Sequence, residues 1–104
     1  MTLQDDARDL LRSAAWLIRQ PMCWSRLAIA RDMSGLAVPV SWPTAVQWCG
    51  RGALLAIEPK PHIAYFVAEE LFFRRHGQNI PPVNDLPNMT AARMAQMMRE
   101  AAEE

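Results

Sequence analysis

Prolines bound nearly every regular element that this 104-residue sequence can form. Proline lacks a backbone donor and disfavours helical geometry in the residue before it. Pro21 is therefore expected to end a first helix by Gln20, and Pro59 to end a second one. Pro61 is expected to start a third helix, because proline is tolerated in a first helical turn. The eight prolines thus divide the chain into short elements joined by loops.

The first segment predicts an amphipathic helix that begins after Thr2. Thr2 is a good N-cap residue, and Asp5 stands at the capping-box position three residues later. Apolar residues then recur at i, i+3, i+4 and i+7, which is the spacing of one helical face. We expect this face to lie in the core: Ala7, Leu10, Leu11, Ala14, Leu17 and Ile18.

Two short apolar runs, 27–31 and 36–40, flank the sequence DMSG. Gly35 suits the left-handed conformation that closes a four-residue loop, which favours a β-hairpin. Pro39 would confine the second strand to an edge of the sheet. An alternative interpretation is a helix from Ser25 to Met33 that ends at Gly35.

A second helix is expected to open at Ser41, an N-cap type of residue, with Pro43 in its first turn. The stretch WCGRGALLAI then places two glycines inside this helix, where each costs about 0.5–1 kcal/mol relative to alanine. Gly52 falls on the buried face, beside Trp48, and Gly50 lies about a third of a turn away. We expect Gly52 to mark a close approach of another element that leaves no space for a side chain.

The third helix, 61–76, is apolar on nearly all sides, which predicts a central position and a buried Phe72 and Phe73. Gly77 is expected to cap its end. The segment QNIPPVNDLPN, residues 78–88, contains three prolines and is expected to be a loop.

Thr90 or Asn88 is expected to cap a last helix, and the final EAAEE is expected to fray. The inner side of this helix holds Met94, Met97, Met98 and Ala101. Together these elements predict an α-rich α+β fold in a single domain over residues 1–104, with about four helices and one small β-hairpin between the first and second helix.

The charge balance restricts the classes of partner. Lys and Arg number 11, as do Asp and Glu, so the formal net charge is zero. A general nucleic-acid binder normally shows a basic excess, so nucleic acid is not expected as a sole partner. No apolar run approaches the roughly 20 residues that span a bilayer, and no signal peptide is recognised. We therefore expect a cytoplasmic protein with no membrane partner.

Cys23 and Cys49 have no neighbouring Cys or His at metal-ligand spacing, so neither a zinc site nor a cofactor is expected. Cys49 is nevertheless a candidate nucleophile, with His62, His76, Asn84 or Asp85 as activating groups. A small cysteine-dependent enzyme is thus one alternative function. The favoured interpretation is a buried packing residue in the middle of a helix, because activated cysteines prefer helix N-termini.

Three motifs in this order resemble an uncharacterised family of small, mostly helical actinobacterial and phage proteins: LAIARDMSGLAVPV (27–40), WCGRGAL (48–54) and NDLPNMT (84–90). Members of that family often carry an aromatic residue before the Asn-Asp pair, where this chain has Val83. The resemblance implies a fold and a setting in a mobile element or an actinobacterium. It implies no reaction.

Asn84 and Asp85 are interpreted as turn formers that bond their own backbone, although a loop Asp could bind a metal or act as a base. Arg74, Arg75 and His76 form the only basic cluster. A nucleic-acid binder using Arg74 and Arg75, with Arg51, is a second alternative function.

Four tryptophans and three phenylalanines are more aromatic bulk than a chain of this size readily buries, which predicts an exposed apolar surface. Trp and Arg are enriched at binding hot spots. We expect a binding site on the hairpin and its flanks, formed by Trp24, Arg26, Arg31 and Trp42. The favoured function is a non-catalytic protein-binding accessory or inhibitor of a phage or other mobile element, acting against a host defence complex. Self-association is a further expectation.

Overall fold

The computed structural model describes residues 2–57 and 63–104. It is an α-rich α+β fold with five helices and a small two-stranded antiparallel sheet between the first and second helix in this part of the chain. The long helices are α1 (Leu3–Leu17), α2 (Gly50–Ile57), α3 (Ile63–His76) and α5 (Ala91–Ala101). Shorter elements are the 3-10 helix η1 (Pro21–Cys23), the strands β1 (Ala30–Arg31) and β2 (Gln47–Trp48), and α4 (Ile80–Asn84). The predicted boundaries at Pro59 and Pro61, and His62, lie outside the described residues.

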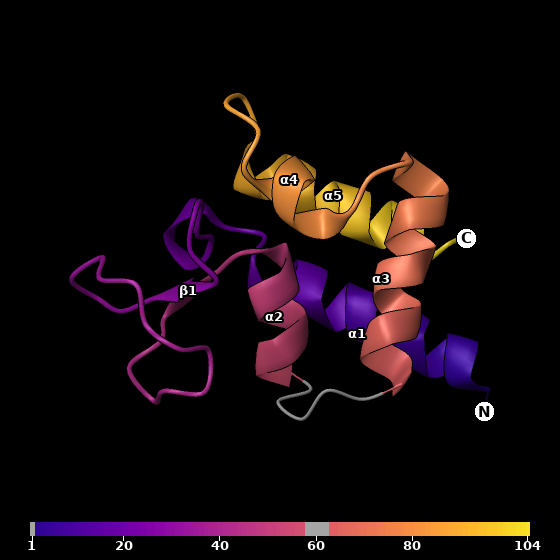
Figure 1. Cartoon of the computed structure of the whole chain (residues 1–104), viewed down its shortest axis with the longest axis horizontal. Coiled ribbons are helices and arrows are strands. Elements are labelled where there is room, and N and C mark those ends of the chain that lie inside the picture. The colour runs from indigo at the N-terminus through magenta and orange to yellow at the C-terminus, as the bar shows by residue number, and fades with distance from the viewer. Residues whose placement is uncertain (1, 58–62) are drawn as a thin grey trace.

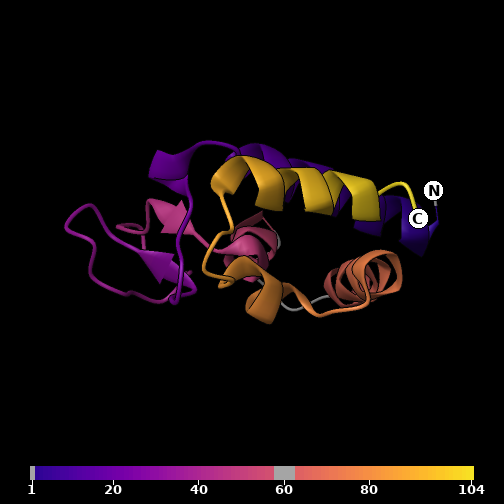
Figure 2. The ribbon, with the colours of Figure 1, turned by 90° about the horizontal axis from the view of Figure 1, so that it is seen from above.

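Helices α1, α2, α3 and α5 form a helical body (Figure 1). Figure 2 shows α5 running beside α1, with α3 below both of them in the picture. The core of the body is built from the apolar faces of these helices, with Leu11, Phe72 and Met94 among its fully buried side chains. Residues 24–49, here called the arm, project from one end of this body, and both termini lie toward the other end.

The first helix is confirmed, including its cap. The Thr2 hydroxyl accepts from the Asp5 N–H at 3.1 Å, and the Asp5 carboxylate accepts from the Thr2 N–H at 3.2 Å. These reciprocal bonds satisfy donors that a helix start leaves free. The predicted face is buried apart from Leu17, which is partly buried.

The predicted partner strand of the hairpin is wrong. Gly35 does take a left-handed φ of 86°, and the Asp32 N–H donates to the Leu36 carbonyl across the turn. However, β1 pairs with β2, with Ala30 opposite Trp48, while the 36–40 run contributes only a bridge between Arg31 and Ala37. The 36–40 run lies along the other edge of β1, where the Val38 N–H donates to the Ala30 carbonyl at 3.0 Å, and Pro39 has no N–H to extend that ladder.

The predicted start of the second helix is also wrong. Helix α2 begins at Gly50, and the Ser41–Pro43 region lies outside any regular element. Trp48 therefore lies in a strand, and Cys49 directly precedes the helix. The strand pairing of β2 uses backbone groups that a helix over the same residues would need for itself.

The close approach predicted at Gly52 is confirmed. A Cβ on Gly52 would collide with the backbone carbonyl of Ile29 in the arm. At Gly50, the nearest atoms to a Cβ are side-chain atoms, Ile80 Cγ2 at 2.8 Å and Met94 Cε at 2.9 Å. The two glycines thus let α2 touch the arm on one side and the core on the other.

Helix α3 is less central than predicted. It buries one face against α1 and α5, while Ile63, Phe66 and Phe73 are at least half exposed. Phe72 is fully buried as predicted, but the expectation of a buried Phe73 is wrong. Its C-terminal end carries the predicted glycine cap, with Gly77 at φ 71°.

The loop predicted over 78–88 contains the short helix α4, with Pro81 in its first turn, where a missing N–H costs little. Thr90 caps α5 by accepting from the Arg93 N–H at 3.2 Å, and Met94, Met98 and Ala101 are buried as predicted. Met97 is only partly buried.

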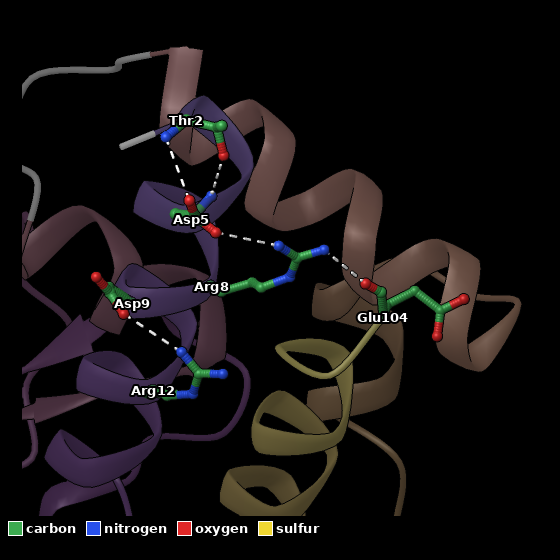
Figure 3. A network of polar contacts seen from close by, with 6 residues as sticks. All are labelled: Thr2, Asp5, Arg8, Asp9, Arg12 and Glu104. Carbon is green, nitrogen blue, oxygen red and sulfur yellow. Dashed lines mark hydrogen bonds and ion pairs between the residues drawn. The ribbon is translucent and has the colours of Figure 1, made fainter.

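The C-terminal tail does not fray as predicted. Ala102 is fully buried, and Arg8 joins α1 to the last residue by donating to the Glu104 backbone carbonyl at 2.9 Å (Figure 3). The same arginine contacts Asp5 of the capping box at 3.4 Å. Among the described helices, none combines the length and apolar character that a membrane crossing requires.

Candidate functional site

A cavity of about 220 Å³ lies where the base of the arm meets α2 and α4. Three separate chain segments form its walls, so it exists only in the folded protein. Its apolar lining comes from the arm and α4, and its polar lining from the first turn of α2 and the end of α4. The arm and α4 contribute Leu27, Ala28, Ile29, Cys49 and Pro81, and the polar residues are Arg51, Asn84 and Asp85.

Asn84 holds these three segments together. Its Oδ1 accepts from the Trp24 indole N–H at 2.8 Å and from the Gly50 N–H at 3.0 Å. Its Nδ2 donates to the Ser25 carbonyl at 3.0 Å and to Asp85 Oδ1 at 3.1 Å. The side chain is fully buried, and all its hydrogen-bonding capacity is used. The bond to Gly50 also satisfies one of the free donors at the start of α2.

Asp85 fixes an unusual backbone conformation in the arm. Its Oδ1 accepts from the Leu27 N–H at 2.9 Å. Leu27 has a φ of 65°, a left-handed value that costs a non-glycine residue free energy, and its side chain is 74% exposed at the edge of the cavity. The interpretation of Asn84 and Asp85 as local turn formers is therefore wrong, because their bonds reach residues about 35 to 60 positions away.

Cys49 lines the cavity, directly before the first residue of α2. Its sulfur accepts from the Gly52 N–H at 3.2 Å. Burial raises the pKa of the Cys49 thiol and outweighs the lowering effects of the Gly52 and Arg51 N–H groups, and the Asp85 carboxylate adds a smaller raising effect. Although the position at a helix start differs from the mid-helix position predicted, the sulfur is a neutral thiol at pH 7.

Arg51 borders the cavity but is paired within the body. It makes a bidentate contact with Glu69 of α3, at 2.6 and 3.1 Å, and the Tyr65 hydroxyl also donates to Glu69 at 3.1 Å. Burial, followed by the negative charge of Glu69, raises the pKa of Tyr65 to about 12. The positive charge of Arg51 is therefore largely neutralised by its own neighbour.

Three of the four predicted binding residues use their polar groups within the chain. Trp24 is half-buried and bonded to Asn84, with the Arg26 guanidinium 5.2 Å from the centre of its ring. Arg26 donates to the backbone carbonyls of Pro87 and Met89, at 3.2 and 2.6 Å. Arg31 donates to the carbonyls of Gly35 and Arg26, at 2.8 and 3.0 Å. These residues lie together and shape the arm.

Trp42, the fourth predicted binding residue, is 53% exposed in the loop before β2. It shares the arm with other exposed large apolar side chains: Leu27, Ile29, Met33, Leu36 and Val46. This confirms the prediction that the chain exposes apolar bulk. Binding roles for the four residues stay predictions.

Sequence reasoning missed the arm and α4 residues of the cavity, namely Leu27, Ala28, Ile29 and Pro81. They are small or apolar residues without a chemical signature, and only folding brings them beside Cys49. Within residues 2–57 and 63–104, no group of three or more His, Cys, Asp or Glu side chains gathers in a way that would hold a metal ion.

Comparisons with protein-family models, curated proteins and solved structures find no match to this chain. The resemblance to small actinobacterial and phage proteins therefore stays a prediction, and the functional argument rests on the geometry of the arm and the cavity.

Proposed function

We propose that this chain is a non-catalytic protein-binding module that contacts its partner through the arm. The observation that carries the proposal is the composition of the arm after β1: residues 33–49 contain no Asp, Glu, Lys or Arg in a chain with 21% charged residues. Within that segment, Met33 is 90% exposed, Leu36 63% and Trp42 53%. Exposed apolar side chains on a projecting element that carries no charge are typical of protein interaction sites.

The internal bonds of the arm support the same function. Trp24 and Arg26 fix the base of the arm to α4 and the segment after it, and Arg31 donates to the Gly35 carbonyl within the segment that exposes apolar side chains. A pre-organised surface loses less conformational entropy on binding than a flexible loop. In this account Trp42 contacts the partner, and the other three predicted residues position the arm.

The resemblance to phage and actinobacterial proteins supports an accessory or inhibitor role, with a host defence complex as the target. The proposal also places the chain in the cytoplasm, where the free thiols of Cys23 and Cys49 would stay reduced.

The two alternative functions have weaker support. A cysteine-dependent enzyme needs a thiolate, and burial and Asp85 both favour the neutral thiol of Cys49. A nucleic-acid binder needs free basic groups, whereas Arg74 lies 3.4 Å from Glu70 and Arg75 lies 3.7 Å from Glu104. Arg51 is likewise paired with Glu69.

Affinity capture from a host lysate, followed by titration with the purified partner, tests the proposal. Met33→Ser with Trp42→Ser should weaken binding by about 2 kcal/mol or more, the scale of interface hot spots. The matched control is Ile63→Ser with Phe66→Ser, which removes equally exposed apolar groups from α3 and should leave binding unchanged. The proposal fails if only the α3 variant loses binding, if nucleic acid alone is captured, or if light scattering finds only self-association.

A further inference from the structure

The cavity at the base of the arm is the right size for a single side chain. At about 220 Å³ it falls below the roughly 300–1,000 Å³ of pockets that hold small-molecule ligands. Protein interfaces commonly place one large apolar anchor of the partner in a pocket of this kind, near the centre of the contact. Because its walls include Leu27 and Ile29, the cavity is continuous with the exposed apolar side chains of the arm.

The lining favours an apolar occupant. Most of the wall consists of apolar side chains, from Leu27, Ala28, Ile29 and Pro81. The neutral sulfur of Cys49 behaves as a further small apolar group. Asn84 also borders the cavity, but its amide is already fully bonded and offers no free donor or acceptor. A strongly polar ligand would therefore lose more hydrogen bonds to water than it could form with this lining.

Asp85 adds one uncompensated negative charge to the cavity. Its Oδ1 accepts bonds from the Leu27 N–H and from Asn84, whereas its Oδ2 accepts none from the described residues. It also forms no ion pair within residues 2–57 and 63–104, while the positive charge of Arg51 is balanced by Glu69. A cation next to the apolar anchor would complement this carboxylate.

We propose that the cavity receives one large apolar side chain of the partner protein, and that Asp85 pairs with a Lys or Arg adjacent to that side chain in the partner. This proposal rests on the protein-binding function proposed above. It specifies two adjacent residues of the partner, one large and apolar and the other a Lys or Arg. The left-handed conformation of Leu27 supports it, because backbone strain of this kind clusters at binding sites.

The test uses blocked dipeptides as probes, with binding followed by NMR at the amides of Leu27, Ile29 and Gly50. N-acetyl-Phe-Arg-amide should shift these amides saturably, with a dissociation constant on the order of 1 mM. N-acetyl-Phe-Glu-amide and N-acetyl-Ala-Arg-amide should each bind at least about fivefold more weakly, because one lacks the cation and the other the anchor. Equal binding of the three probes, or no saturable shift with the first, would overturn the proposal.

Two variants make the test specific. Ala28→Phe should fill the cavity and abolish probe binding, whereas Ala37→Phe adds the same bulk at an exposed arm residue outside the cavity and should not. Asp85→Asn keeps an acceptor for the Leu27 N–H but removes the charge, so it should abolish the preference for Arg over Glu. Circular dichroism verifies that each variant is folded. Unchanged probe binding by folded Ala28→Phe, or an unchanged preference in folded Asp85→Asn, would refute the proposal.

The captured partner separates this proposal from the function on which it rests. If folded Ala28→Phe binds the partner as tightly as the unmodified protein, the cavity proposal fails while the arm keeps its role. If no protein partner is captured but the dipeptides bind with the stated preference, the cavity chemistry holds and the protein-binding function fails.

Discussion

The helical body and the arm differ in what holds them together. The body buries a large set of apolar side chains from α1, α2, α3 and α5, including Leu11, Phe72 and Met94. The separate core of the arm has only Ala30, Val38 and Ala45 as buried members among the described residues. Such small side chains bury little apolar area, so the arm depends on hydrogen bonds and on its contact with α2.

Under the proposed function, this difference places stability in the body and partner binding in the arm. The body supplies the free energy of folding through packing, and the arm is held in shape by a few polar residues, above all Asn84. An element with little packing of its own is free to expose apolar side chains to a partner. Substitutions at the contact between the arm and the body, made in one of the two at a time, test this difference.

The largest effect is expected for Asn84→Ala. Removing the amide leaves the Trp24 indole N–H, the Gly50 N–H and the Ser25 carbonyl without their partner. Each unsatisfied buried group costs about 1–3 kcal/mol, so we expect a loss of about 3–5 kcal/mol in the free energy of unfolding. Denaturant unfolding measures this loss, with exposed Asn88→Ala as the control, expected within about 0.5 kcal/mol. A loss below about 1 kcal/mol for Asn84→Ala would show that Asn84 does not hold the arm.

The next effect is expected for Gly52→Ala, at about 2–3 kcal/mol. The added methyl group collides with the Ile29 backbone, which cannot move without displacing the arm from α2. Gly50→Ala is the matched control, because its methyl group meets side-chain atoms, Ile80 Cγ2 and the flexible end of Met94, and no backbone. The same unfolding experiment should give a smaller loss for Gly50→Ala. Equal losses would mean that the arm contact is no tighter than ordinary core packing.

A smaller change in the free energy of unfolding is expected at high pH, and it comes from Tyr65 in α3 of the body. Tyr65 is the only tyrosine, so tyrosinate absorbance reports its titration alone. Its folded pKa of about 12 lies above the ordinary value of 10. The resulting stabilisation is present below pH 10 and is lost as pH rises to about 12, at most roughly 3 kcal/mol.

Unfolding measured across this pH range should show the loss in the unmodified protein and a shallower one in Tyr65→Phe. An absorbance midpoint near 10 in protein that circular dichroism shows to be folded would contradict the burial of this hydroxyl.

The smallest effect on stability is expected at Cys49, where Cys49→Ala should cost about 1 kcal/mol or less. The more informative measurement is its reaction with a thiol reagent near pH 7. Since burial raises its pKa, Cys49 should react at least about tenfold more slowly than the half-buried Cys23, with each thiol measured in the variant lacking the other. Faster labelling of Cys49 would favour the cysteine-dependent enzyme.

Local pattern was sufficient for α1 and α5. Helices α1 and α5 carry their caps and their apolar faces within the segment itself, at Thr2 and Thr90 and at the buried residues that follow. A contact between distant segments could be inferred at Gly52, because a glycine on a buried helical face lets a neighbouring backbone come closer than any side chain would allow. The extent of burial of α3 was overestimated because hydropathy alone does not reveal that no further element covers Phe66 and Phe73 among the described residues.

The arm and the cavity could not be predicted in the same way, because bonds between distant residues determine them. Ser41 and Pro43 have the local features of a helix start, yet β2 pairs with β1 and α2 begins only at Gly50. Asn84 lies in a segment rich in turn-forming residues, NDLPN. Nothing nearby in the sequence indicates that its side chain bonds to Trp24 and Ser25. The cavity could not be predicted for the same reason, because its walls come from three separate segments of the chain.

Hydrogen exchange of the free and the partner-bound protein tests most directly whether the arm is the binding element and the body its support. We predict that amides of residues 33–46 exchange faster than those of α1 and α5 in the free protein, because so little packing protects them. Bound partner should slow their exchange at least about tenfold and leave the amides of α3 unchanged. Slowed exchange along α3, with none in residues 33–46, would contradict the account.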